Sequence, residues 1–142
     1  MVAYIDSSVV LRHILLGQIA LARALAFPNP MSSELLEIEC RRVIHRCRLA
    51  GELDDRTLVA AEERLDAVLA GLDLVELAPA IKKRAMEAFP VNVRTLDALH
   101  LATALEYRAR AVGQELLVFS HDRGMNLCAR ALGFGTPFSE AR

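Results

Sequence analysis

The sequence predicts an α/β protein built around a mostly parallel sheet. Short apolar runs rich in β-branched residues alternate with longer segments of helical periodicity along the chain. This alternation is typical of parallel strands joined by helical crossovers. The 142 residues are enough for one core but hardly for two, and 54% of them are hydrophobic. No linker, repeat or low-complexity stretch interrupts the chain, so we expect a single domain over residues 1–142.

Apolar patterning and turn residues place the elements of the first half. The run VAYI has the composition of a strand buried on both faces, and Gly51 ends a long helical pattern, as glycine commonly does. The expected elements are a strand at 2–5, a helix at 9–16, a turn at 27–30, a short strand at 31–33 and a helix at 34–49.

The second half follows the same alternation. Asp54 or Asp55 can cap a helix, and Pro79 suits the first turn of another. The run ELLVFS is typical of a buried strand. The expected elements are a helix from 54 or 55 to 70, a strand at 72–78, a short helix from 79 that ends before Pro90, a helix at 95–111, a strand at 115–120, a helix ending at Gly133 and an edge strand at 136–138.

Composition and charge exclude several classes of protein. The three cysteines are an odd number without short paired spacing, which argues against a disulfide framework and a zinc site. The net charge is −1, so total charge does not predict nucleic-acid binding. The N-terminus lacks the pattern of a signal peptide, and no apolar run approaches membrane-spanning length. We therefore expect a cytoplasmic protein that does not enter a membrane.

Four acids occupy unusual positions relative to the expected elements. Asp6 and Asp122 each follow the end of a strand, and parallel strands end at the same edge of their sheet. Glu39 and Asp97 lie near the starts of two helices, and Asp97 belongs to an otherwise apolar segment. If both helices begin above the strand ends, all four carboxylates can meet in one cleft.

Each acid also has an ordinary explanation that involves no cleft. These explanations are helix capping by Asp6, a helix-dipole interaction of Asp97, surface ion pairs of Glu39 with Arg42 or Arg46, and turn formation by Asp122. They do not explain why all four acids fall at strand ends or neighbouring helix starts. Clustered carboxylates repel one another unless a cation neutralises them, and oxygen ligands suit Mg²⁺ or Mn²⁺. Phosphodiester hydrolysis is the chemistry that such sites support.

The chain resembles the PIN-domain ribonucleases, and within them the VapC toxins of bacterial VapBC toxin–antitoxin pairs. The matching segments are YIDSSVVL, SSELLEIECRR, RTLDALHLATAL and VFSHDRGMNLCARALG, spread in family order from end to end. The third of these is the most specific. The resemblance implies a three-layer α/β/α sandwich with a central, mostly parallel sheet.

The resemblance also implies an activity, a metal and partners. It implies a Mg²⁺- or Mn²⁺-dependent endoribonuclease whose metal is held by Asp6, Glu39, Asp97 and Asp122, with Ser8 and Ser120 supporting the site. It implies a VapB-like antitoxin, an RNA substrate, and a homodimer that can enter a heterotetramer or larger complex. Residues that can contact RNA or the antitoxin are Arg41, Arg42, His121 and Arg123, although a solvated helix face or an incidental histidine explains them equally simply.

Other functions place acids at strand ends as well. A receiver domain requires a lysine after its last strand, and no lysine follows Ser120. A phosphatase of the haloacid-dehalogenase type requires Asp-x-Asp after the first strand, but Ser8 occupies the second position. The remaining alternative is a PIN-like binding module without catalytic activity. His100, one turn after Asp97, is either structural or directed toward the site.

Overall fold

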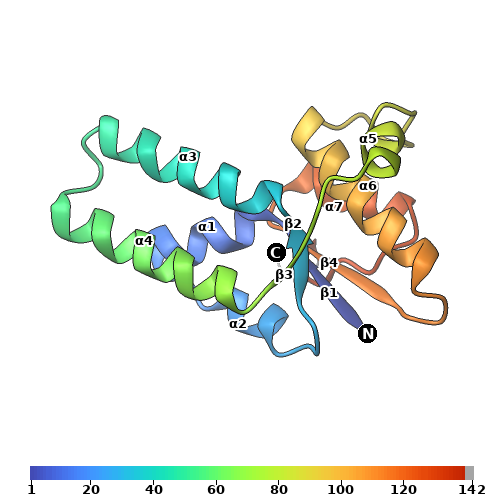
Figure 1. Ribbon diagram of the computed structural model, residues 1–142, viewed down its shortest axis with the longest axis horizontal. Helices are drawn as coiled ribbons and strands as arrows, with labels where there is room; N and C mark the ends of the chain where they lie inside the picture. The colour runs from blue at the N-terminus through green and yellow to red at the C-terminus, as the bar shows by residue number, and fades with distance from the viewer. Residues whose placement is uncertain (140–142) are drawn as a thin grey trace.

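The computed structural model describes residues 1–139, and its centre is a four-stranded, entirely parallel sheet (Figure 1). The strands are β1 (Val2–Ile5), β2 (Met31–Ser33), β3 (Asp73–Val75) and β4 (Leu116–Phe119), in the order β3-β2-β1-β4. The predicted α/β class with a parallel sheet is confirmed. The predicted limits of one domain over 1–142 stay a prediction, and residues 140–142 lie outside the described part.

Helices cover both faces of the sheet, which gives the expected three layers (Figure 1). Helices α1 to α4 lie on one side, and α5 to α7 lie on the other. Their bounds are α1 (Ser7–Leu16), α2 (Ala20–Leu25), α3 (Leu35–Leu49), α4 (Asp55–Ala70), α5 (Pro79–Ala85), α6 (Thr95–Arg110) and α7 (Arg123–Ala131), with a final 3₁₀ turn, η1 (Pro137–Ser139). No helix within residues 1–139 is both long and apolar enough to span a bilayer.

The strand β1 is buried on both faces, as its continuous apolar sequence predicts. Ala3 and Ile5 pack with α1, α3 and α4, whereas Val2 and Tyr4 pack with α6 and α7 on the opposite side. This division follows from the alternation of side chains along a strand. The two cores are therefore joined through the central strand of the sheet.

The predicted edge strand at 136–138 is wrong. Gly135 forms only an isolated parallel bridge with Leu117, and residues 137–139 form the 3₁₀ turn η1. Pro137 has no N–H group to donate to a neighbouring strand. Phe138 instead packs edge-on against Phe119, with ring centroids 5.0 Å apart. Two smaller differences are the unpredicted helix α2 and the shorter strand β3, which covers 73–75 rather than 72–78.

The pairing of β1 with β4 determines where the polar residues at the strand ends lie. The register pairs Ile5 with Phe119, and the N–H of Asp6 donates to the carbonyl of Phe119 at 3.0 Å. Asp6 and Ser120 are therefore neighbours at the carboxyl edge of the sheet. This edge is where ligands bind in open parallel sheets.

The buried side of α4 should contribute strongly to stability. Leu65 is fully buried in the core between α4 and the sheet. We expect Leu65→Ala to lower the free energy of unfolding by about 2–5 kcal/mol, because it removes apolar contacts and leaves a cavity. Val59→Ala on the exposed side of the same helix should cost less than about 0.5 kcal/mol. Urea denaturation of both variants measures this difference, and equal losses would contradict the packing described.

Candidate active site

All four predicted acids line one cavity of about 460 Å³ at the carboxyl edge of the sheet. Asp6 follows β1, Glu39 lies on α3, Asp97 lies in the first turn of α6, and Asp122 precedes α7. The fold thus brings together side chains that are more than one hundred residues apart in the sequence. The cavity is also lined by Ser7, Ser8, Leu11, Arg94, Thr95 and Leu96.

Asp6 is held by hydroxyl groups rather than used as a helix cap. It occupies the cap position of α1, but its side chain makes no capping hydrogen bond. Its Oδ2 atom accepts hydrogen bonds from the hydroxyls of Ser8 and Ser120, both at 2.8 Å. Ser8 Oγ accepts from the N–H of His121 at 2.9 Å, and Ser120 Oγ accepts from the N–H of Asp122 at 3.0 Å. The two serines therefore fix Asp6 against the chain that follows β4.

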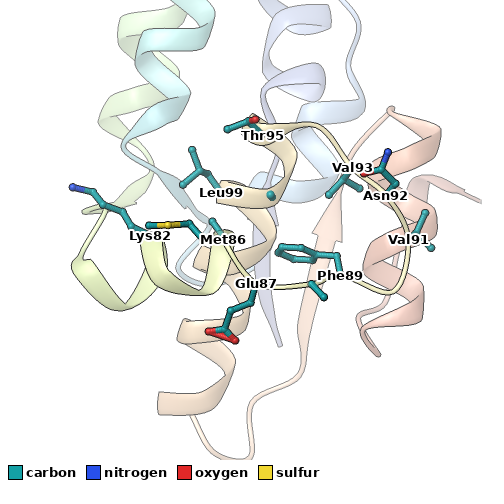
Figure 2. Close-up of a pocket in the computed structure, with 12 residues that line it drawn as sticks. Lys82, Met86, Glu87, Phe89, Val91, Asn92, Val93, Thr95 and Leu99 are labelled. Carbon is teal, nitrogen blue, oxygen red and sulfur yellow. The ribbon is translucent and has the colours of Figure 1, made fainter.

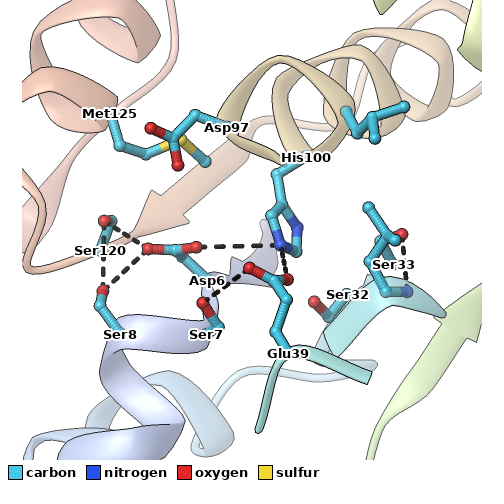
Figure 3. A network of polar contacts seen from close by, with 12 residues as sticks. Asp6, Ser7, Ser8, Ser32, Ser33, Glu39, Asp97, His100, Ser120 and Met125 are labelled. Carbon is cyan, nitrogen blue, oxygen red and sulfur yellow. Dashed lines mark hydrogen bonds and ion pairs between the residues drawn. The ribbon is translucent and has the colours of Figure 1, made fainter. Parts of the chain in front are cut away.

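Glu39 is held by His100 and Ser7, next to Asp6 (Figure 3). Its Oε1 atom lies 2.5 Å from His100 Nε2, and its Oε2 atom accepts a hydrogen bond from Ser7 Oγ at 3.2 Å. The other ring nitrogen of His100 lies 2.6 Å from Tyr4 Oη in β1. Glu39 thus points inward from α3, and within residues 1–139 it forms no surface ion pair with Arg42 or Arg46.

His100 is fully buried among groups that favour its charged form. Burial by itself lowers the pKa of His100, but the hydrogen bond to Glu39 and the charges of Glu39, Asp6 and Asp97 outweigh it, so the pKa is raised. In the charged imidazolium both ring nitrogens donate, one to Glu39 and the other to Tyr4. His100 therefore belongs to the core and also contacts an acid of the cavity.

Asp97 carries the clearest electrostatic sign of a carboxylate cluster. Its side chain is 15% exposed, and the pKa of Asp97 is raised from 3.8 to about 6. Burial is the largest cause, followed by the negative charges of Asp6 and Asp122, while Arg94 and His100 act in the opposite direction. The ionised group is therefore disfavoured where it stands unless a positive charge approaches it.

Asp122 divides its two oxygens between the protein backbone and the cavity. Its Oδ1 accepts from the N–H of Met125 at 2.8 Å and so caps α7. Its Oδ2 lies 3.4 Å from the guanidinium of Arg94. Arg94 also lies 3.9 Å from Asp97, and its side chain is 83% exposed. The positive charge of this arginine therefore lies close to two acids of the cavity.

The donor set suits a hard divalent cation. Carboxylate oxygens are the ligands that Mg²⁺ and Mn²⁺ prefer. Such an ion would offset the negative charges of Asp6 and Asp122, which after burial raise the pKa of Asp97. Within residues 1–139 no three His, Cys, Asp or Glu side chains are arranged as they stand to hold a metal ion. Glu39 is hydrogen-bonded to His100, and Oδ1 of Asp122 accepts from the N–H of Met125 in α7. The side chains of Glu39 and Asp122 would therefore rotate when an ion binds.

Comparison with known sequences identifies the family. A sequence model of the PIN domain matches residues 3–129. The chain belongs to the PIN-domain family. No curated protein matches the sequence closely enough to add to this assignment.

Comparison with solved structures supports the same fold for this PIN domain. The chain is similar to a structure titled "Toxin-antitoxin complex from Klebsiella pneumoniae", with a TM-score of 0.56 and 19% sequence identity. The match covers 84% of this chain and 86% of the other. At this identity the likeness concerns the fold alone.

None of the four predicted contact residues of the PIN domain lines the acidic cavity. Arg41 pairs with Glu37, Glu62 and Asp66, so its charge is largely balanced within α3 and α4. Arg42 lines a separate hollow on the outer side of α3. His121 and Arg123 flank Asp122 in sequence but line a different cavity beside α7. Contacts of these residues with RNA or an antitoxin stay predictions.

Three residues of the site were not predicted. Ser7 bonds Glu39, Tyr4 bonds His100, and Arg94 approaches both Asp97 and Asp122. The spacing of Arg94 and Asp97, three residues apart at a helix start, is a signal that the sequence offered. Tyr4 offered none, because its partner is 96 residues away.

A larger cavity of about 580 Å³ lies between α5 and α6 (Figure 2). Its walls are mainly apolar and include Met86, Phe89, Val91 and Leu99. Glu87 is the only acid among its described lining residues. It is larger than the acidic cavity, but its side chains offer little for metal or acid–base chemistry.

The pKa of Asp97 gives a pH-dependent contribution to stability. Because the folded protein binds this proton more tightly than the unfolded chain, the contribution is complete below pH 3.8 and is lost as the pH rises through about 6. In chelator-treated buffer, we expect Asp97→Asn to become more stable than the wild type across this range, by up to about 3 kcal/mol at pH 7.

Urea denaturation at several pH values measures this effect. Asp73→Asn, at the exposed start of β3, is the matched control and should show no such pH-dependent difference. A large loss of stability in Asp97→Asn at pH 7 would instead mean that Asp97 is chiefly structural.

Proposed function

We propose that this PIN domain is a Mg²⁺- or Mn²⁺-dependent endoribonuclease that acts as the toxin of a VapBC-type toxin–antitoxin pair. The observation that supports the proposal most directly is the shared cavity of Asp6, Glu39, Asp97 and Asp122. Four acids from separate elements converge there, and after burial the negative charges of Asp6 and Asp122 are the main causes that raise the pKa of Asp97. A structural role alone gives no reason for this arrangement.

The residues of the cavity have distinct roles in the proposal. Asp6, Asp97, Asp122 and Glu39 would hold the divalent ion, which when bound supplies an activated water and stabilises charge on the reacting phosphate oxygens. Ser8 and Ser120 keep Asp6 in a single orientation, and Ser7 and His100 orient Glu39. Arg94 partly balances Asp97 and Asp122 before the cation arrives.

The proposed partners follow from the family and from the structural neighbour. That neighbour is a toxin–antitoxin complex, which supports a small antitoxin as the partner of this chain. We propose that a VapB-like antitoxin covers the acidic cavity and that the domain forms a homodimer, alone or within a heterotetramer or larger complex. RNA is the proposed substrate, and the cytoplasm is the proposed location.

Cleavage of RNA tests the proposal directly. The purified chain should cut single-stranded RNA in Mg²⁺ or Mn²⁺ and lose activity in excess EDTA. Asp97→Asn should reduce the cleavage rate by about a hundredfold or more, because it removes one charge from the proposed ligand set. Asp73→Asn should cut at the wild-type rate, since this acid lies at the start of β3, outside the cavity. Full activity of Asp97→Asn would remove this residue from the mechanism.

A catalytically inactive PIN-like binding module is the alternative function. It is favoured by the present arrangement of the acids, in which no three described side chains are poised around one ion. Thermal unfolding with added Mn²⁺ tests whether the acids bind a metal ion or have only a structural role. We expect Mn²⁺ to raise the Tm of the wild type by several degrees and to leave the Tm of Asp97→Asn nearly unchanged.

The two readouts together decide between the alternatives. A rise in Tm with Mn²⁺ but no RNA cleavage under any condition would favour the inactive binding module. No rise in Tm and no cleavage would contradict the metal site itself.

A further inference from the structure

A basic cavity lies next to the acidic one, beside α1 and α7. Its volume is about 790 Å³, and its walls include Arg12 of α1 together with Arg123 and Arg130 of α7. The wall also includes His121, Asn126 and Phe138. None of its described lining residues is acidic. The cavity therefore concentrates positive charge in a protein whose net charge is −1.

The three arginines are not balanced by acids of the described chain. Within residues 1–139, Arg12, Arg123 and Arg130 form no ion pair with Asp or Glu. Arg41 and Arg48 show the contrast, because each pairs with at least one acid. Guanidinium groups bind phosphate oxygens through paired hydrogen bonds, so this wall suits a polyanion.

Two buried polar atoms on the same wall have no hydrogen-bond partner among residues 1–139. They are Nε2 of His121 and Oδ1 of Asn126. Buried polar atoms are rarely left without a partner, so this pair points to a ligand that carries hydrogen-bonding groups. Both side chains are held in place by other contacts. The ring of His121 stacks on Phe138 with centroids 5.0 Å apart, and Asn126 Nδ2 donates to the carbonyl of Ser120 at 2.8 Å.

The basic and acidic cavities adjoin at the segment 120–123. Asp122 lines the acidic cavity, and its neighbours His121 and Arg123 line the basic one. The N–H of His121 also donates to Ser8, which holds Asp6. A strand of nucleic acid with one phosphate between the carboxylates can therefore place adjacent nucleotides along the arginines.

We propose that the basic cavity binds single-stranded RNA beside the phosphate that is cleaved. The arginines contact backbone phosphates, and His121 and Asn126 hydrogen-bond to a ribose or base. This inference rests on the proposed nuclease function and names the surface through which the substrate is held. A basic groove that follows the backbone is the usual means of holding single strands.

The unpaired oxygen of Asn126 favours RNA over an acidic peptide segment. It is an acceptor and requires a donor. Ribose hydroxyls and base amino groups are donors, whereas the carboxylate side chains of an acidic peptide are acceptors only. An acidic protein partner would match the arginines with its side chains, but only a backbone N–H could donate to this atom.

Equilibrium binding tests the proposal without depending on cleavage. The full-length chain with Asp97→Asn binds a short fluorescein-labelled single-stranded RNA, and anisotropy gives the Kd at several KCl concentrations. Adding Arg12→Ala, Arg123→Ala and Arg130→Ala should weaken binding about tenfold or more. The slope of log Kd against log salt should fall by about 2, since each lost phosphate contact removes about 0.7.

A matched control removes the same charge from other surfaces. Arg56, Lys83 and Arg110 are exposed and lie outside both cavities. Their replacement by alanine in the same background should leave the Kd and the salt slope nearly unchanged. Circular dichroism and Tm values confirm that each variant is folded. A polyglutamate peptide is the second ligand, and its binding tests whether the cavity holds an acidic partner.

The possible outcomes are distinct. An unchanged Kd and salt slope in the Arg12/Arg123/Arg130 variant would overturn the proposal, and loss of polyglutamate binding alone would assign the cavity to an acidic partner. If RNA binding depends on the three arginines but the wild-type chain never cleaves RNA, the binding site is supported and the nuclease function is refuted. If the wild type cleaves RNA but binding does not depend on the arginines, the nuclease function is supported and this binding site is refuted.

Discussion

The parallel pairing of β1 with β4 is the constraint on which the site depends. Its register places the residue after Ile5 beside the residue after Phe119, and so makes Asp6 and Ser120 neighbours. The hydrogen bonds that form the sheet thus determine a distance between polar side chains. The starts of α1 and α7, which follow these strand ends directly, are brought to the same edge. The acidic cavity is consequently a product of sheet topology.

The acids of the cavity are stabilised in different ways, and the difference has chemical consequences. Asp6 and Glu39 are held by hydroxyl and imidazole groups, which lower the cost of burying charge. Burial, and after it the negative charges of Asp6 and Asp122, raise the pKa of Asp97 to about 6. His100, which contacts Glu39, and Arg94, which contacts Asp97 and Asp122, supply positive charge to the cluster. The cavity is thus incompletely neutralised, which favours the binding of a cation.

Acidic and basic surfaces of this PIN domain meet at one short segment after β4. Ser120 bonds Asp6 and Asp122 lines the acidic cavity, whereas His121 and Arg123 line the basic one. In the proposed function a polyanionic substrate would use both surfaces, because the carboxylates alone repel negative phosphates. Contact of the two surfaces within four consecutive residues would then couple the position of a bound strand to the position of its reactive phosphate.

The sequence by itself determined the alternation of strands and helices, the α/β class and the four acids, because apolar periodicity and turn residues act over a few neighbouring positions. It did not determine that Glu39 turns inward to His100, or that Arg41 is balanced by acids of α4. It also misplaced an edge strand, where packing of Phe138 on the core prevailed over local propensity. Such distances between side chains of separate elements exist only after helices pack against the sheet, so the tertiary structure alone decides them.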